Sequence, residues 1–193
     1  MDSANKQTAI IAEVTQRTTP ATPAFKVLRD IRVSGSPDRP ATRSPERRGD
    51  RMAANMTSGL YTFPKTIELP WVRDEGLDVL WESALCGAWA TNVLKNGSTK
   101  KPFTLEEKYE GGATDPYRRL AGCLVDSTSI SFRAGQPGTI SFGIQALAET
   151  AATAAIASST YAAPTPGYDP STPADIVVND CFSVSGAKVV NLD

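Results

Sequence analysis

The stretch GCLVDSTSISFRAGQPGTISFGIQA, residues 122–146, decides the fold class. Apolar and small polar residues alternate on both sides of a loop that contains glycines and a proline. Alternation with a period of two is typical of a strand that packs on one face only, and Gly and Pro favour the turn. We therefore predict a β-hairpin over residues 128–147. Its polar face, which meets water or a polar partner, carries Ser129, Ser131, Arg133, Ser141 and Gln145.

A helix is predicted at residues 74–89, DEGLDVLWESALCGAW. Apolar residues recur there at steps of three and four, which places them on one helical face. Asp74, Glu75 and Asp78 near its amino end suit the helix dipole. The predicted apolar stripe consists of Leu77, Leu80, Trp81, Ala84, Leu85 and Ala88.

Three further stretches have the pattern of strands. Residues 58–70 contain Pro64, which favours an edge position because proline cannot donate to a sheet ladder. Residues 102–110 alternate, although Glu107 interrupts their apolar face, and residues 117–133 lead into the hairpin. The chain is therefore predicted to be mainly β, with an α+β fold and one flanking helix.

The two ends of the chain differ in composition from its middle. Residues 1–57 are rich in Pro, Ser, Thr and Arg and poor in apolar residues, so we predict an arm that becomes ordered only by docking on something else. Within it, residues 25–33 fit one strand added to a sheet, either of its own chain or of a neighbouring subunit. Residues 148–193 are predicted as an Ala-, Thr- and Pro-rich loop followed by strands. This division leaves residues 58–147 as the β core.

Two segments near the carboxyl end have secondary-structure patterns of their own. Residues 146–158 fit an Ala-rich helix by propensity, or an extended continuation of the preceding strand. We favour the extended interpretation. Residues 176–192 predict two short strands around Ser185-Gly186.

Charge is distributed unevenly, although the net charge is −1. Residues 26–51 hold eight Arg or Lys against four Asp or Glu, a net of +4. Residues 148–193 hold one Lys against five acids, a net of −4. Segments of opposite sign suit subunits that meet in a defined order, and two solvated segments are the alternative interpretation.

Composition excludes several classes of protein. The near-neutral net charge gives no general sign of nucleic-acid or membrane binding. The amino end lacks the pattern of a secretory signal, and no apolar run approaches the roughly 18 residues of a membrane span. We therefore expect a soluble protein made in a cytoplasm. Cys86, Cys123 and Cys181 are far apart, form no disulfide framework, and are interpreted as core residues.

The sequence shows no catalytic or cofactor-binding pattern. The chain has no histidine, which removes the usual base and metal ligand, and no nucleophile elbow, P-loop or dinucleotide fingerprint occurs. Glu106 and Glu107 are adjacent in a strand, so they point to opposite faces and form a poor acid–base pair. We predict no enzyme activity, no cofactor and no metal.

The arginine cluster RSPERRGDR, residues 43–51, is the sharpest remaining local signal. It could bind phosphates, but acids interleave with the arginines and no aromatic residue is present to stack on bases. An ion-pair strip between subunits is the preferred interpretation. Its residues are Arg43, Glu46, Arg47, Arg48 and Arg51.

The order of these segments resembles the tail tube (major tail) proteins of long-tailed bacteriophages and prophages. The resemblance begins in TPATPAFKVLRDI and SPERRGDR and continues through the helix LDVLWESALCGAW. The strand FTLEEKY, the strand AGCLVDSTSISF and the hairpin return GTISFGIQAL follow in the same order. It spans about residues 20–147, and it depends on the order and spacing of the motifs because no single motif is specific.

This resemblance implies a structural virion protein with a small β-sandwich or barrel. In the family, six copies form a ring, and rings stack into the tube through which the genome leaves the capsid. Hairpins of neighbouring subunits join into one inner barrel, and arms and loops contact the adjacent ring. A lumen for DNA should be polar and not strongly positive, which the hairpin's Ser- and Gln-bearing face satisfies, except at Arg133. The hairpin residues are therefore expected at the lumen or at a ring interface.

The implied partners are other copies of the chain, a tape measure protein and a tail terminator. DNA is expected to pass through the lumen without sequence-specific binding, and no membrane is involved. The location is the virion tail, after synthesis in the cytoplasm of a bacterial host. A related ring-forming terminator or connector is the first alternative, and a nucleic-acid-binding module that uses residues 43–51 is the second.

Related chains are often longer, with a further β-rich part after the region equivalent to residues 176–193. A short version of the protein and an incomplete gene product therefore both stay open.

Overall fold

The computed structural model describes residues 6–43, 56–72, 74–109, 116–132 and 138–164. These ranges contain one helix, α1 (Glu75–Leu85), and thirteen strands. The strands up to the helix are β1 (Lys6–Ala12), β2 (Ala24–Val27), β3 (Arg32–Ser34), β4 (Ala41–Arg43), β5 (Met56–Ser58) and β6 (Phe63–Pro70). Those after it are β7 (Trp89–Ala90), β8 (Val93–Leu94), β9 (Phe103–Tyr109), β10 (Tyr117–Ser131), β11 (Thr139–Ala146), β12 (Ala148–Ala152) and β13 (Thr160–Ala162).

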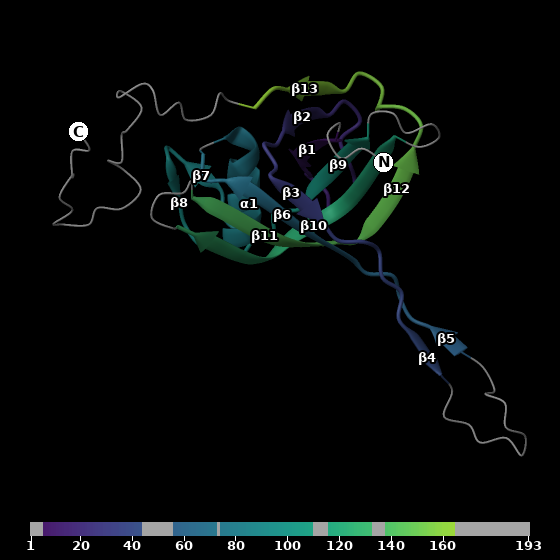
Figure 1. Cartoon of the computed structure of the whole chain (residues 1–193). Coiled ribbons are helices and arrows are strands. Elements are labelled where there is room, and N and C mark those ends of the chain that lie inside the picture. The colour runs from purple at the N-terminus through teal and green to yellow at the C-terminus, as the bar shows by residue number, and fades with distance from the viewer. Residues whose placement is uncertain (1–5, 44–55, 73, 110–115, 133–137, 165–193) are drawn as a thin grey trace, which may run out of the picture.

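Two sheets share the long strand β10. Its first part pairs with β9 and β12, and its second part pairs with β11. The β9 sheet has the order β13-β2-β1-β9-β10, and the β11 sheet has the order β10-β11-β6-β3. All pairs are antiparallel except β13 with β2. The strand path does not close into a barrel within the described residues, so the fold is mainly β, as predicted (Figure 1).

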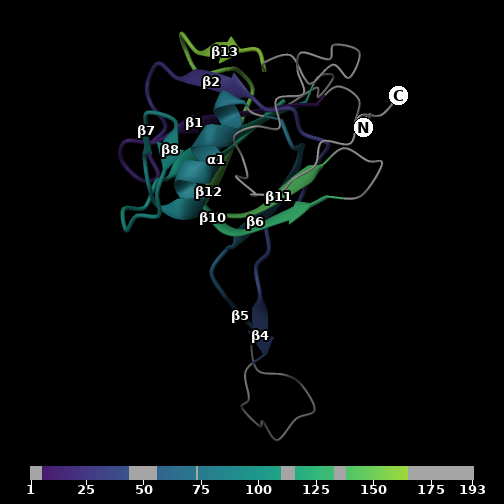
Figure 2. The same cartoon turned by 90° about the vertical axis from the view of Figure 1, so that its left-hand side faces the viewer.

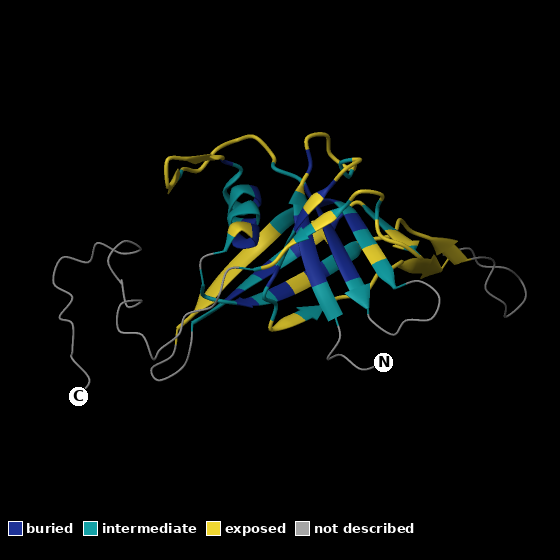
Figure 3. Ribbon diagram, turned by 90° about the horizontal axis from the view of Figure 1, so that it is seen from above, coloured by how far each residue is buried: buried dark blue, intermediate teal, exposed yellow. Residues whose placement is uncertain are grey.

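One core fills the space between the two sheets and the helix. The β9 sheet contributes Ile10, Phe103 and Leu105, and β11 contributes Phe142. From α1, Leu80 enters the same cluster. The ring of Trp81 meets that of Phe142 edge to face, with centroids 5.5 Å apart, an arrangement that aromatic pairs prefer. Figure 3 shows the buried residues concentrated in the crossing strands and on the inner side of the helix.

The bend in β10 is made by a glycine and held by a buried carboxylate. Gly122 has a φ of 67°, a left-handed conformation that favours glycine, and the pairing with β9 shifts register between Leu120 and Cys123. Glu13 is 7% exposed, and its Oε1 accepts hydrogen bonds from Gly122 N at 2.9 Å and Thr104 Oγ1 at 2.6 Å. This arrangement lets one strand serve both sheets.

We expect Gly122→Ala to lower the free energy of unfolding by about 2 kcal/mol, because a left-handed non-glycine residue costs roughly 1–2 kcal/mol. A Cβ at this position would also lie 3.0 Å from Leu147 Cδ1. Urea unfolding measures the loss. Adding Leu147→Ala relieves the crowding and should recover part of the stability. A stability within about 0.5 kcal/mol of wild type for Gly122→Ala would contradict the assigned strain.

The predicted helix is confirmed but ends four residues early, at Leu85 rather than residue 89. Asp74 caps its amino end by accepting a hydrogen bond from Gly76 N at 3.4 Å. Cys86 is left-handed, with a φ of 51°, and a Cβ on Gly87 would lie 2.1 Å from the carbonyl oxygen of Lys95. The chain after β8 therefore packs closely against Gly87, where the helix has ended. Ala88, which was predicted in the apolar stripe, lies beyond the end of the helix.

Part of the predicted arm over residues 1–57 is ordered in the structure. Residues 6–12 pair along their whole length with β9, and Phe25 of β2 is fully buried and stacks on the ring of Tyr161. The segment orders because it docks on its own chain. Residues 25–33 are also not one strand, since β2 pairs with β1 whereas β3 pairs with β6. The division of the chain at residues 57 and 147 stays a prediction.

The predicted edge position of the Pro64 strand is wrong, because β6 lies between β11 and β3. Its partner β3 reaches only from Thr66 to Glu68, so Pro64 lies beyond that pairing. The extended interpretation of the Ala-rich segment 146–158 is confirmed by β12, which covers Ala148–Ala152. The predicted strands at 176–192 and Cys181 lie outside the described residues.

A buried ionic cluster joins both sheets at Glu107. Its side chain is fully buried and contacts Lys65 Nζ of β6 at 3.1 Å and Lys6 Nζ of β1 at 3.0 Å. The hydroxyl of Tyr109 donates a third hydrogen bond at 3.0 Å. Burial raises the pKa of Glu107, but the two lysines outweigh burial, and the pKa lies below its ordinary value. The residue that seemed to interrupt an apolar face is therefore a cross-link.

We expect Glu107→Gln to lower the free energy of unfolding at pH 7 by about 3 kcal/mol, because it leaves the lysines buried without their counter-charge. Since the folded pKa is below the unfolded value, this contribution is complete above pH 4.5 and is lost as the pH falls through the folded pKa. Urea unfolding at several pH values should show a flatter acid limb for the variant.

Glu75→Gln is the matched control, because Glu75 forms an exposed pair with Lys26 at 3.2 Å. Its stability should stay close to wild type at each pH. Equal stability of Glu107→Gln and wild type at pH 7 would contradict the role of this cluster.

Candidate assembly surfaces

Two rows on one face of the β11 sheet consist of polar residues and a glycine from edge to edge. In the register of the sheet, Ser129 lies opposite Ser141, Ser141 opposite Glu68, and Glu68 opposite Arg32. The neighbouring row runs through Ser127, Gly143, Thr66 and Ser34. Phe142, which meets Trp81 of α1, alternates with these residues and points the other way. The polar face therefore lies on the side of the sheet away from the helix.

The structure brings together four of the five predicted hairpin residues. Ser129, Ser131, Ser141 and Gln145 share the polar face, whereas Arg133 lies outside the described residues. Sequence reasoning missed the rest of this face, namely Arg32, Ser34, Thr66, Glu68, Ser127 and Thr139. The alternation within residues 122–146 and around Thr66 and Glu68 gave a signal for some of these residues. It did not indicate which strands would lie side by side.

The β11 sheet has two edges without a partner among the described residues. One is β3, and the other is the second part of β10, where residues 126–131 are exposed. Trp71 N donates to Gly138 O at 2.8 Å, which fixes the phase of hydrogen bonding along β11. Along a strand, the backbone N–H and C=O groups of successive residues point alternately to the two sides. Those of Ser129 therefore point to β11, whereas those of Thr128 and Ile130 point to the free edge of β10.

A projecting hairpin, residues 38–43 and 56–62, stands away from the sheets (Figures 1 and 2). Its strands β4 and β5 are exposed throughout. At its base, the Arg39 guanidinium lies 4.9 Å from the ring centroid of Tyr61, and Leu60 is 87% exposed. An isolated two-stranded hairpin is marginally stable in water, so this element suits contact with another molecule.

Of the predicted arginine strip, only Arg43 is described, as an exposed residue of β4. Glu46, Arg47, Arg48 and Arg51 lie outside the described residues. Their proposed contacts between subunits stay a prediction.

An apolar patch lies at the end of the β11 sheet opposite the projecting hairpin. The rings of Trp71 and Phe132 meet edge to face with centroids 5.3 Å apart, and Phe132 is 58% exposed. Ile130 adds to the patch and is 42% exposed. An exposed aromatic pair of this kind marks an interaction surface more often than a catalytic site.

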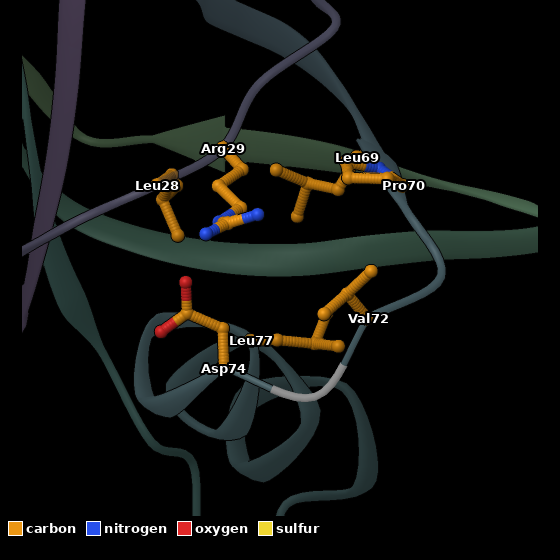
Figure 4. A pocket seen from close by; sticks show the side chains of 7 residues that line it. All are labelled: Leu28, Arg29, Leu69, Pro70, Val72, Asp74 and Leu77. Carbon is orange, nitrogen blue, oxygen red and sulfur yellow. The ribbon is translucent and has the colours of Figure 1, made fainter. Parts of the chain in front are cut away.

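The cavity in Figure 4 is too small for an organic ligand. It measures about 10 Å³, which is room for one water molecule. Arg29 Nε and Asp74 Oδ2 line it and are buried without a hydrogen-bond partner. A cavity of this size fits a structural rather than a catalytic role.

The described residues contain no catalytic arrangement. Glu106 contacts Arg119 and Tyr161, whereas Glu107 contacts lysines, so the two carboxylates do not form a pair. Burial raises the pKa of the Cys123 thiol far above its ordinary value, which agrees with the predicted core role. Within the described ranges no three acidic or cysteine side chains gather to bind a metal ion. No helix there is long and apolar enough to cross a membrane.

Comparison with known proteins agrees with a role in assembly. The sequence matches the phage tail tube protein family over residues 3–183. The chain belongs to this family. It is therefore a structural component of the phage tail and not an enzyme, as the sequence predicted. No curated protein matches this tail tube protein in sequence.

One solved structure shares the fold of this tail tube protein at low sequence identity, and two others show a weaker similarity. The SPP1 tail tube is 12% identical, with a TM-score of 0.55 over 82% of this chain and 81% of that one. A chain of the anti-feeding prophage baseplate is 12% identical, with a TM-score of 0.49 over 78% and 94%. A chain of the sheath/tube terminator of the PVC contractile injection system is 13% identical, with a TM-score of 0.45 over 78% and 95%.

Proposed function

We propose that this tail tube protein forms hexameric rings by pairing the two free edges of its β11 sheets. The main supporting observation is that the second part of β10 and the strand β3 are both open among the described residues, at opposite edges of one sheet. Closing such sheets around a ring removes every free edge. Six copies per ring are what the family resemblance implies.

The polar face of the β11 sheet forms the lumen of the proposed ring. The opposite face is covered by α1, so it has no surface to offer to a channel. Among the described residues of the polar face, Glu68 and Arg32 are the charged ones, and they lie opposite each other. A hydroxyl-rich face without net charge lets DNA pass without holding its phosphates. Ser129, Ser131, Ser141 and Gln145 are placed there.

Rings stack into the tube through which the phage genome leaves the capsid. The projecting hairpin and the Trp71–Phe132 patch lie at opposite ends of the β11 sheet, which gives each ring two different surfaces. Contact between unlike surfaces repeats without closing and builds a filament. A tape measure protein and a tail terminator are the further partners, in a virion tail assembled after synthesis in the bacterial cytoplasm.

Negative-stain microscopy of the concentrated protein tests this function. We expect rings that stack into tubes. Rings that never stack would instead assign the chain to a terminator or connector role. A well-folded monomer at all concentrations would contradict ring formation.

Thr128→Pro should abolish ring formation and leave the subunit folded. Proline removes the N–H that Thr128 presents to the free edge, without touching the ladder between β10 and β11. Sedimentation velocity should show the variant as a monomer, with the circular dichroism of the wild type. Thr128→Ala is the matched control and should form rings. Rings of Thr128→Pro equal in yield to wild type would contradict edge pairing at β10.

A further inference from the structure

A groove lies between α1 and the β7–β8 hairpin, on the side of the molecule away from the projecting hairpin (Figures 1 and 2). Its volume is about 240 Å³, which is enough for a long side chain. Three carboxylates and one lysine line it, a net of two negative charges, together with an indole and a valine. These residues are Glu75, Asp78, Glu82, Lys26, Trp89 and Val79.

The indole of Trp89 is held in a fixed orientation at the edge of the groove. Its backbone N–H donates to Glu82 Oε1 at 3.0 Å, and its ring Nε1 donates to the carbonyl oxygen of Asp78 at 3.2 Å. The residue is still 37% exposed. Glu75, at the mouth, pairs with Lys26 Nζ at 3.2 Å, and its side chain is still 72% exposed. A fixed aromatic face beside carboxylates is the arrangement that recognises a guanidinium group.

The projecting hairpin carries such a group. Arg43 is exposed in β4, at the far end of the described part of this hairpin. The described residues of the hairpin hold two arginines, Arg39 and Arg43, against one acid, Asp38. Their charge is therefore complementary to that of the groove.

We propose that the groove receives Arg43 of a second copy of this chain, in the adjacent ring. The inference rests on the proposed function, because it supplies the contact by which rings stack. The elements α1, β7 and β8 that line the groove lie on the side of the molecule away from the projecting hairpin (Figure 1). Each copy therefore donates an arginine in one direction and receives one from the other. The contact therefore repeats without closing.

Single charge reversals on either side should stop stacking but not ring formation. In Arg43→Glu, a carboxylate meets the acidic groove, and in Glu75→Lys, an ammonium group meets Arg43. Like charges brought together at an interface oppose association, so the critical concentration for tubes should rise at least about tenfold in each variant. Sedimentation of tubes measures it, and micrographs count the rings.

Mixing the two variants gives the decisive result. The carboxylate that Arg43→Glu places on the hairpin fits the ammonium group that Glu75→Lys places in the groove. The unchanged hairpin of the second variant and the unchanged groove of the first also fit each other. When rings of each variant are formed separately and then mixed in equal numbers, they should therefore form tubes at a critical concentration near that of wild type. Lys100→Glu, a charge reversal on an exposed residue outside the groove, is the matched control and should stack normally.

Each outcome separates this contact from the proposed function. Stacking of Arg43→Glu like wild type, or a mixture that stays as rings, overturns the contact and leaves ring formation intact. A wild type that forms no rings fails the proposed function, and the contact is then tested by cross-linking. Arg43→Cys mixed with Glu75→Cys and a short bismaleimide should give a dimer that neither variant gives alone. Absence of that dimer overturns the contact.

Discussion

The bend of β10 at Gly122 is the constraint on which the rest of the structure depends. Because β10 belongs to both sheets, the place where it turns sets the angle between them, and hence the volume of the core. The turn exposes a backbone N–H to the interior, where an unpaired donor is costly, and Glu13 accepts its hydrogen bond at 2.9 Å. The strand β1 that leads to Glu13 is therefore a structural part of the sheets and not an appendage.

The buried charges add a second constraint, on register. Burying Glu107 costs desolvation that only well-placed partners offset, and these partners come from β1 and β6, one in each sheet. A slip of one residue in β6 would turn Lys65 toward the polar face and bring Thr66 or Pro64 to the core. The ionic cluster thus favours a single pairing of strands, in which the serine rows of the β11 sheet also align.

Sequence reasoning succeeded where the signal is local and failed where it depends on distant partners. The hairpin and the helix follow from periodicity within about twenty residues, so Ser129 and Ser141 were placed on one face correctly. Residues 1–57 contain few apolar residues and were predicted to need a docking partner. Thr8 and Glu13 in this segment form hydrogen bonds with distant residues, namely Asp30, Thr104 and Gly122. Arg32 and Glu68 joined the polar face through a register that no single segment encodes.

Open strand edges usually allow uncontrolled aggregation. In this protein, the length, charge and twist of the two edges limit which strands can pair with them. The β3 edge is three residues long and carries Arg32, whose charge disfavours a partner that places a cation opposite it. On the other edge, the register shift between Val125 and Ser127 increases the local twist of β10, so a flat strand does not fit it. Pairing is thereby restricted to a short partner with a matching twist. The β3 edge of an identical subunit is a short strand, and it is the partner that the proposed ring supplies.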